Sequence, residues 1–157
     1  LHLEALKDYI GGATAPAKKT IELGDSQTFI SKKAYGSSIV SISEKTIEAV
    51  GLTSLANTLS GQSRYDEALV ELRKAQKLFS EAKELTDNLS PPPQYQKSYD
   101  YHVKALNLDI KGVQLDIQAR EHLMNGEYEL ANLELEQAIE AYKEAISYAE
   151  LSLSTMR

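Results

Sequence analysis

The stretch "GQSRYDEALVELRKAQKLF" (residues 61–79) joins a tight turn to an amphipathic helix. Glycine tolerates a positive φ at a helix C-terminus, so "GQS" at 61–63 is typical of a turn between two helices. After this turn, apolar or small side chains recur at alternating steps of three and four, which places them along one helix face. The members of this series are Tyr65, Ala68, Leu72, Ala75, Phe79 and Ala82. The stretch therefore predicts a helix that packs this face closely against a neighbouring helix.

The same pattern returns 63 residues later as "NGEYELANLELEQAIEAY", from Asn125 to Tyr142. With this shift the two parts of the chain align without a gap, and the turn "NG" falls beside "GQS". The matching pairs after the turns are Tyr65 with Tyr128, Ala68 with Ala131, Leu72 with Leu135, Ala75 with Ala138, Phe79 with Tyr142 and Ala82 with Ala145. The matching pairs before the turns are Val40 with Val103, Ile47 with Ile110, Val50 with Val113, Leu52 with Leu115 and Ala56 with Ala119. We interpret this internal repeat as the duplication of a long helical hairpin.

Proline and glycine mark the boundaries of the two hairpins. "SPPP" (Ser90–Pro93) cannot continue a helix, because proline lacks the backbone N–H and clashes with the preceding turn. "GGATAP" (11–16) separates an amphipathic piece at 1–10 from the rest, and Asp25 or Ser26 is suited to cap the next helix. The predicted segments are an N-terminal helical arm at 1–27, a first hairpin at 28–90 and a second hairpin at 91–157. The sequence thus predicts an all-α fold, an antiparallel four-helix bundle in one compact domain with a short N-terminal arm.

The helix after each turn resembles the second helix of a tetratricopeptide repeat. The pattern G-x-Y-x-x-A of that family is matched by Gly126, Tyr128 and Ala131, and in part by Tyr65 and Ala68. The family repeats every 34 residues and stacks at least three units, whereas this chain repeats twice with a period of 63. The resemblance implies a peptide-binding module as one functional alternative.

A second resemblance covers residues 89–150. "LSPPPQYQKSYDYHVKALNLDIKG", followed by "NGEYELAN" and an alanine-rich helix, is similar to helical-bundle domains of secreted or lipid-anchored bacterial and archaeal proteins, mostly of unknown function. The residues that carry it are Pro91, Pro92, His102, Gly126 and Ala131. The resemblance implies an extracytoplasmic or membrane-anchored protein, with a cytoplasmic location as the alternative.

Composition excludes several classes of function. The chain has no cysteine, so a thiolate nucleophile, a disulfide framework and a Cys-ligated zinc site are excluded. Its formal net charge is −6, whereas a nucleic-acid-binding domain needs a dense basic face. No stretch approaches the roughly 20 apolar residues of a membrane-spanning helix. We therefore expect neither nucleic-acid binding nor membrane insertion within this chain.

No arrangement of polar residues predicts an enzyme, a cofactor or a metal. A di-iron bundle needs Glu-x-x-His motifs, and neither His102 nor His122 follows a glutamate by three residues, so the histidines are expected at the surface or at helix ends. Asp109 and Asp116 share one helix face and could serve acid–base chemistry or bind a metal, but with Lys111 beside them we predict a solvated face. The last helix carries glutamates that are expected to form another solvated face: Glu127, Glu129, Glu134, Glu136, Glu140 and Glu144.

Tyrosines are the best candidates for a binding surface. The chain has nine Tyr, two Phe and no Trp, and tyrosine combines an apolar ring with a polar tip, which suits interfaces and ligand clefts. The candidate binding residues are Tyr95, Tyr99, Tyr101, Tyr142 and Tyr148. The simpler interpretation is that these rings fill the ends of the core. Our first hypothesis is a non-catalytic structural or protein-interaction bundle with an unknown protein partner. The alternatives are a sensor bundle that binds a small ligand and the tetratricopeptide-like module.

Overall fold

A computed structural model of the chain describes residues 23–156, with side chains from residue 32 onward. The described elements are α2 (Leu23–Gly61), α3 (Tyr65–Asp87), the short 3₁₀ helix η2 (Pro93–Tyr95), α4 (Gln96–Met124) and α5 (Tyr128–Met156). No strand occurs among these residues, so the predicted all-α class is confirmed.

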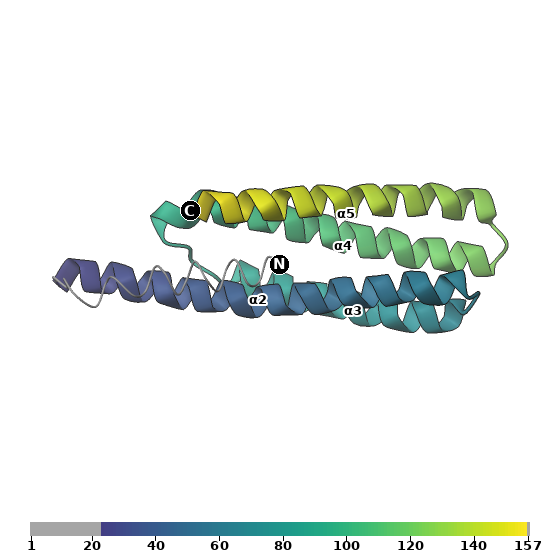
Figure 1. Cartoon of the computed structure of the whole chain (residues 1–157), viewed down its shortest axis with the longest axis horizontal. Helices are drawn as coiled ribbons and strands as arrows, with labels where there is room; N and C mark the ends of the chain where they lie inside the picture. Colours follow the sequence, from purple (N-terminus) through teal and green to yellow (C-terminus); the bar gives the residue numbers. More distant parts are fainter. Residues whose placement is uncertain (1–22, 157) are drawn as a thin grey trace.

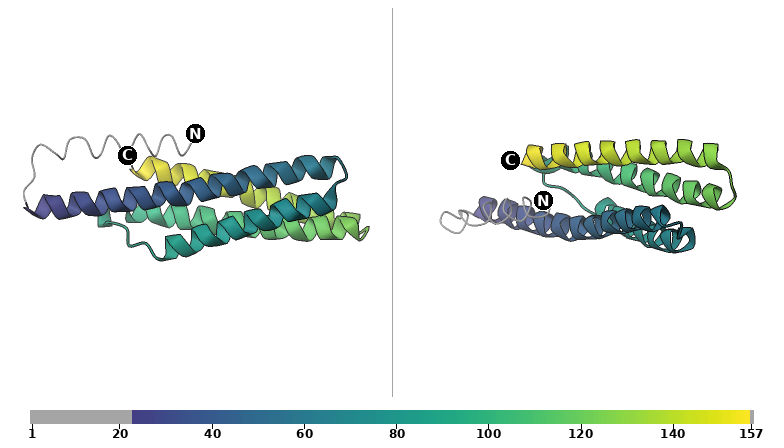
Figure 2. Two further views of the ribbon diagram at one scale, coloured as in Figure 1. Left: turned by 90° about the horizontal axis from the view of Figure 1, so that it is seen from below. Right: turned by 45° about the vertical axis from the view of Figure 1, so that its right-hand side comes forward.

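The four long helices form two antiparallel hairpins that stack on one another (Figure 1). We call α2 and α3 hairpin 1, and α4 and α5 hairpin 2. Figure 2 shows the two hairpins as two layers, one over the other. Helix α3 packs extensively on both α2 and α4, and α4 packs extensively on α5, whereas α2 and α5 make almost no contact. The predicted four-helix bundle is therefore confirmed, but it is open along the edge between α2 and α5.

The ends of the helices agree with those predicted from the sequence, except at the start of α2. Helix α3 ends at Asp87 and α4 begins at Gln96, so "SPPP" separates the two hairpins as predicted. Helix α2 begins at Leu23 in the described chain, so Asp25 and Ser26 lie inside it rather than at its cap. No proline interrupts the segment from 23 to 61, and one helix can run through the predicted boundary at residue 27. The predicted amphipathic piece at 1–10 lies outside the described residues.

The two turns have the same conformation, residue for residue along the repeat. Ser63 has φ 59° and Gly126, its equivalent, has φ 78°. Each donates its backbone N–H to the carbonyl three residues before it, and the next N–H reaches back five residues, from Arg64 to Leu59 and from Glu127 to His122. The prediction that a glycine bends the first turn is wrong, because Gly61 closes α2 and Ser63 adopts the left-handed conformation. The match supports duplication of the hairpin.

The predicted apolar faces form the core. The buried members are Ala68, Leu72, Ala75, Phe79 and Ala82 on α3, and Ala131, Ala138 and Ala145 on α5. Their small side chains allow close helix packing. Tyr128 contradicts the prediction, because its side chain is 64% exposed at the first residue of α5, where the bundle ends. Met124, in the last turn of α4, is likewise exposed.

Candidate functional site

A groove runs along the open edge between α2 and α5, with α4 as its floor. We call it the α2–α5 groove, and its volume is about 330 Å³. Its lining residues are Ser43, Thr46, Ile47 and Val50 on α2, His102, Ala105, Leu106 and Asp109 on α4, and Ala145, Ile146 and Ala149 on α5. Most of this lining is apolar. The groove exists because α3 and α4 join the two hairpins while α2 and α5 do not close over them.

Large apolar side chains stay exposed along the walls of this groove. Ile47 on α2 is 45% exposed and Ile146 on α5 is 54% exposed. Ile47 and Val50 belong to the stripe that repeats in α4, where Val113, the equivalent of Val50, is fully buried. The repeat therefore places the same apolar residues on both helices, but only α4 has neighbours on both sides. The exposed stripe of α2 is the feature that an occupant of the groove would cover.

Asp109 lies in the floor of the groove and is only 8% exposed. This contradicts the prediction of a solvated face. Its carboxyl group has no hydrogen-bond or ion-pair partner among the described residues, and burial raises its pKa from the ordinary value to about 7. A carboxyl group held this way is neutral or charged depending on small changes in its surroundings.

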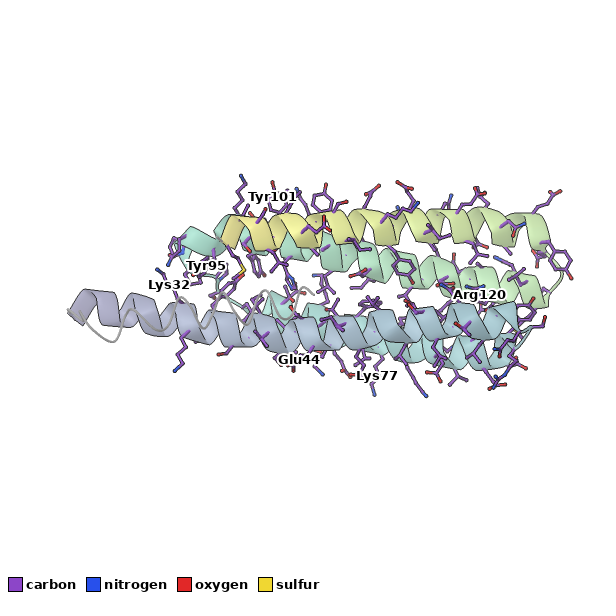
Figure 3. All side chains as sticks on the ribbon, viewed as in Figure 1. Lys32, Glu44, Lys77, Tyr95, Tyr101 and Arg120 are labelled. Carbon is purple, nitrogen blue, oxygen red and sulfur yellow. The ribbon has the colours of Figure 1, made fainter. Side chains whose placement is uncertain are left out.

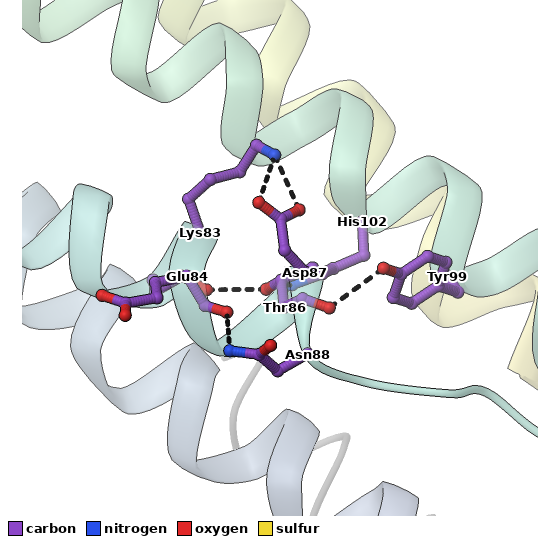
Figure 4. Close-up of polar contacts among 8 residues, drawn as sticks. Lys83, Glu84, Thr86, Asp87, Asn88, Tyr99 and His102 are labelled. Carbon is purple, nitrogen blue, oxygen red and sulfur yellow. Dashed lines mark hydrogen bonds and ion pairs between the residues drawn. The ribbon is translucent and has the colours of Figure 1, made fainter.

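His102 also lines the groove, two turns before Asp109 on α4. The hydroxyl of Thr86 donates to the carbonyl of Ala82 (2.7 Å), so the Nε2–H of His102 donates to Thr86 Oγ1 (3.1 Å). Figure 4 shows these side chains where α3 ends, together with Tyr99. Burial lowers the pKa of His102 to about 4, so the ring is neutral and Nδ1 is an acceptor. His102 is half-buried, so the predicted surface position holds only in part.

A buried ion pair lies two turns beyond Asp109, between the hairpins. Arg120 Nε donates to Asp116 Oδ1 (3.1 Å), and its guanidinium also donates to Asn57 of α2. Figure 3 labels Arg120 in this position between the layers. Burial raises the pKa of Asp116, while Arg120 and the hydroxyl of Tyr142 lower it. Asn57 and Arg120 occupy equivalent positions in the two halves of the repeat, so this hydrogen bond joins the two hairpins at matching positions. Asp116 is thus also buried rather than solvated.

The five candidate tyrosines do not form one site. Tyr95 is buried at one end, where its ring stacks on Tyr35, and Tyr99 donates to the carbonyl of Thr86 (2.9 Å). Tyr101 and Tyr148 stack on the outer side of hairpin 2, where Figure 3 labels Tyr101. Lys104 lies over both of those rings. Tyr142 packs on Gly112 and bonds Asp116. None of the five lines the α2–α5 groove.

Other polar groups of the described chain do not build a metal site. No group of three or more His, Asp or Glu side chains suited to a metal ion occurs among residues 32–156. Glu134 departs from the predicted solvated face, because it is buried and bonded to His122 at the end of α4. The other five glutamates of that series are exposed as predicted. Within the described part of the chain, no helix has the length and apolar character that crossing a membrane requires.

One face of α4, which includes the groove-lining residues His102, Ala105 and Asp109, is marked by a pattern in the sequence. His102, Ala105, Asp109, Gly112, Asp116 and Ala119 follow one another at alternating steps of three and four. This is a heptad seam of small and polar residues, parallel to the apolar seam through Leu106 and Val113. Because small residues permit close helix contact, the seam marks the face on which α5 packs.

Comparison of the chain with known protein families, curated proteins and solved structures found no match. The resemblances to tetratricopeptide repeats and to secreted or lipid-anchored bundle domains therefore stay predictions, as does the extracytoplasmic location.

Proposed function

We propose that this chain is a non-catalytic binding module that holds a small, largely apolar ligand in the α2–α5 groove. The observation that carries the proposal is the open edge of the bundle, where Ile47 and Ile146 face a groove of about 330 Å³ and remain half exposed. Ligand sites in proteins are typically concave, roughly 300–1,000 Å³ in volume and apolar, with a few polar groups that orient the ligand. The groove meets this description at the lower end of the range.

The polar groups near the groove support binding rather than catalysis. A nucleophile needs a base within hydrogen-bond reach that accepts its proton. Thr86 and His102 are close enough, but the threonine proton is directed to the carbonyl of Ala82, and the histidine is the donor of the pair. Asp116 is already neutralised by Arg120. These side chains hold the structure of the floor instead of activating one another.

The proposal is tested by titrating the protein with 1-hexanol and following backbone amide shifts by NMR. We expect the largest shifts at Ala105, Leu106 and Ala145, which line the groove. Ile146→Asp places a charge in the apolar wall and should weaken hexanol binding about tenfold, because the ligand would have to cover a carboxylate that loses its water instead of an apolar side chain.

Ile139→Asp is the matched control for that variant. Ile139 lies on the same helix and is 52% exposed, close to the 54% of Ile146, but it does not line the groove. Its substitution should leave the hexanol affinity within twofold. Equal losses in the two variants, or shifts spread over the whole surface, would reject the groove as the binding site.

Exposed apolar side chains on α5 outside the groove favour a second candidate, a protein-interaction module. Leu130, Leu133 and Leu151 are large and exposed, and Tyr101 with Tyr148 adds an aromatic pair on the outer side of hairpin 2. A protein partner that docks there would be lost on substitution Leu133→Glu and retained in Ile146→Asp. The small-ligand function predicts the opposite response for its ligand.

A further inference from the structure

Asp109 is the one feature of the groove floor that the packing of the chain leaves without an explanation. A buried ionised carboxylate is costly unless hydrogen bonds or a countercharge compensate it. Asp116, which is also buried on the same helix face, has Arg120 and Tyr142 as partners. Asp109 has neither a donor nor a cation within reach among the described residues. The same helix thus shows one compensated and one uncompensated carboxyl group.

The other polar side chains of the groove do not supply the missing donor. Thr46 donates its hydroxyl to the carbonyl of Ile42 on its own helix (3.1 Å). His102 donates to Thr86 and has only the acceptor Nδ1 left. Ser43 makes no hydrogen bond with Asp109. The described residues therefore leave the carboxyl group to solvent in the open groove, and a ligand that binds there can supply the missing donor.

We propose that the ligand of the α2–α5 groove is an apolar amine, whose protonated nitrogen binds the Asp109 carboxylate while its hydrocarbon part lies against Ile47, Val50 and Ile146. This inference rests on the proposed function, since it names the chemical class of that ligand. A cation is favoured over a neutral donor because it brings an opposite charge to the buried carboxylate in addition to the hydrogen bond, and that attraction is larger where the dielectric constant is low. Anionic ligands are disfavoured by Asp109 itself and by a chain of net charge −6.

Among the described residues near Asp109, no other group changes its charge near neutral pH. The groups near it are His102, neutral, and Asp116, paired with Arg120, on α4; Tyr142, whose hydroxyl pKa is raised, on α5; and Thr46, Ile47 and Val50, uncharged, on α2. With a pKa of about 7 for Asp109, affinity for an amine should fall about 30-fold from pH 8 to pH 5.5.

The test compares three probes of equal length: n-hexylamine, 1-hexanol and hexanoate. Dissociation constants are measured by NMR titration at pH 8 and pH 5.5. We expect hexylamine to bind at least tenfold more tightly than hexanol at pH 8, hexanoate to bind most weakly, and the preference for the amine to disappear at pH 5.5. Asp109→Asn should reduce the affinity for hexylamine to the level of hexanol measured in the same variant.

Two further variants keep the result interpretable. Asp109→Thr introduces the residue that the repeat has at Thr46, and it serves if the asparagine variant does not fold by circular dichroism. Asp100→Asn removes an exposed carboxylate of the same helix and should change nothing. If hexanol binds in the groove but hexylamine is no tighter, or if its preference survives in Asp109→Asn, the amine inference is overturned and the proposed function stands. If none of the three probes binds the folded protein, the proposed function itself fails.

Discussion

Phe79 of hairpin 1 is completely buried at the position that Tyr142 occupies in hairpin 2. The pair differs together with its surroundings, because Ala49 of α2 corresponds to Gly112 of α4, and Thr53 corresponds to Asp116. Hairpin 1 buries apolar and weakly polar side chains at these positions. Hairpin 2 buries the carboxylate of Asp116 and the guanidinium of Arg120, and it half-buries the phenol of Tyr142. The two hairpins therefore share one helical pattern but differ in the polarity of the side chains inside them. The more polar interior belongs to hairpin 2, whose helix α4 forms the groove floor.

Breaking the ion pair of hairpin 2 should lower the free energy of unfolding far more than the equivalent substitution in hairpin 1, and this is the largest difference that we expect between the hairpins. Asp116→Asn leaves Arg120 charged and buried without its carboxylate, which should lower the free energy of unfolding by about 3–5 kcal/mol. The equivalent change in hairpin 1, Thr53→Val, removes a hydroxyl that donates to the carbonyl of Val50 on its own helix (2.7 Å), and should cost less than about 1.5 kcal/mol. Urea unfolding at pH 7 measures both.

The double variant Asp116→Leu with Arg120→Met sharpens this test. Replacing both charges by apolar groups of similar size removes the desolvation cost as well as the attraction. Its stability should lie well above that of Asp116→Asn. Equal losses in Asp116→Asn and Thr53→Val would show that the two interiors do not differ in energy.

Asp109→Asn should stabilise the protein in a pH-dependent way. The pKa of Asp109 is about 7 in the fold and about 3.9 in an unfolded chain, so the native state binds more protons between these values and loses stability as pH rises through them. The variant should match the wild type near pH 4 and exceed it by about 2–4 kcal/mol at pH 8. His102 acts in the opposite direction, because its lowered pKa removes stability as pH falls from about 6.5 toward 4.

Urea unfolding at pH 4, 5.5 and 8 measures that difference, and Thr46→Val in hairpin 1 is the equivalent control. Thr46 does not titrate, so the stability of this variant should differ from that of the wild type by the same amount at every pH. A gain of Asp109→Asn that is the same at pH 4 and pH 8 would mean that folding does not change the pKa of the Asp109 carboxyl group, so that its burial does not raise it.

The sequence predicted the hairpins well because they depend on local signals. Spacing of three and four fixes a helix face, and the two turns and "SPPP" fix where helices end. It also predicted the duplication, which the equivalent hydrogen bonds of the two turns support. These features can be predicted from the sequence because they depend only on residues close together in the chain and on the spacing between them.

The polar interior could not be predicted in this way. A charged side chain favours solvent, so the sequence predicts an exposed face for Asp109 and Asp116, although both are buried. Their burial depends on α4 being covered on two sides, by α3 and by α5, and single-helix periodicity does not contain that information. The open edge between α2 and α5 could not be predicted for the same reason, because it too depends on how whole helices pack. Ile47 and Val50 continue an apolar stripe, and only the packing of whole hairpins decides that this part stays uncovered.

Gly112→Ala should destabilise the protein through the close contact of α4 with Tyr142. A Cβ at this position would lie 2.7 Å from Tyr142 Cε1, so the ring must shift, and overpacking of this kind costs about 1–3 kcal/mol. Gly51→Ala in α2 is the control, because nothing lies within 4 Å of the added Cβ there. It should gain about 0.5–1 kcal/mol from helix propensity. If the melting temperature shifts in the same direction in both variants, the close contact between Gly112 and Tyr142 is contradicted.

The smallest predicted effect comes from the two turns. Ser63 has a positive φ, a conformation that costs a non-glycine residue about 1 kcal/mol, whereas its equivalent Gly126 adopts it freely. Ser63→Gly should therefore raise the free energy of unfolding by about 1 kcal/mol, and Gly126→Ser should lower it by a similar amount. Ser63→Gly combined with Gly126→Ser exchanges the two residues between hairpins, and contributions from separate, equivalent turns should cancel. Urea unfolding of the three variants measures this, and an exchange variant that differs from the wild type by 1 kcal/mol or more would mean that the two turns are not energetically equivalent.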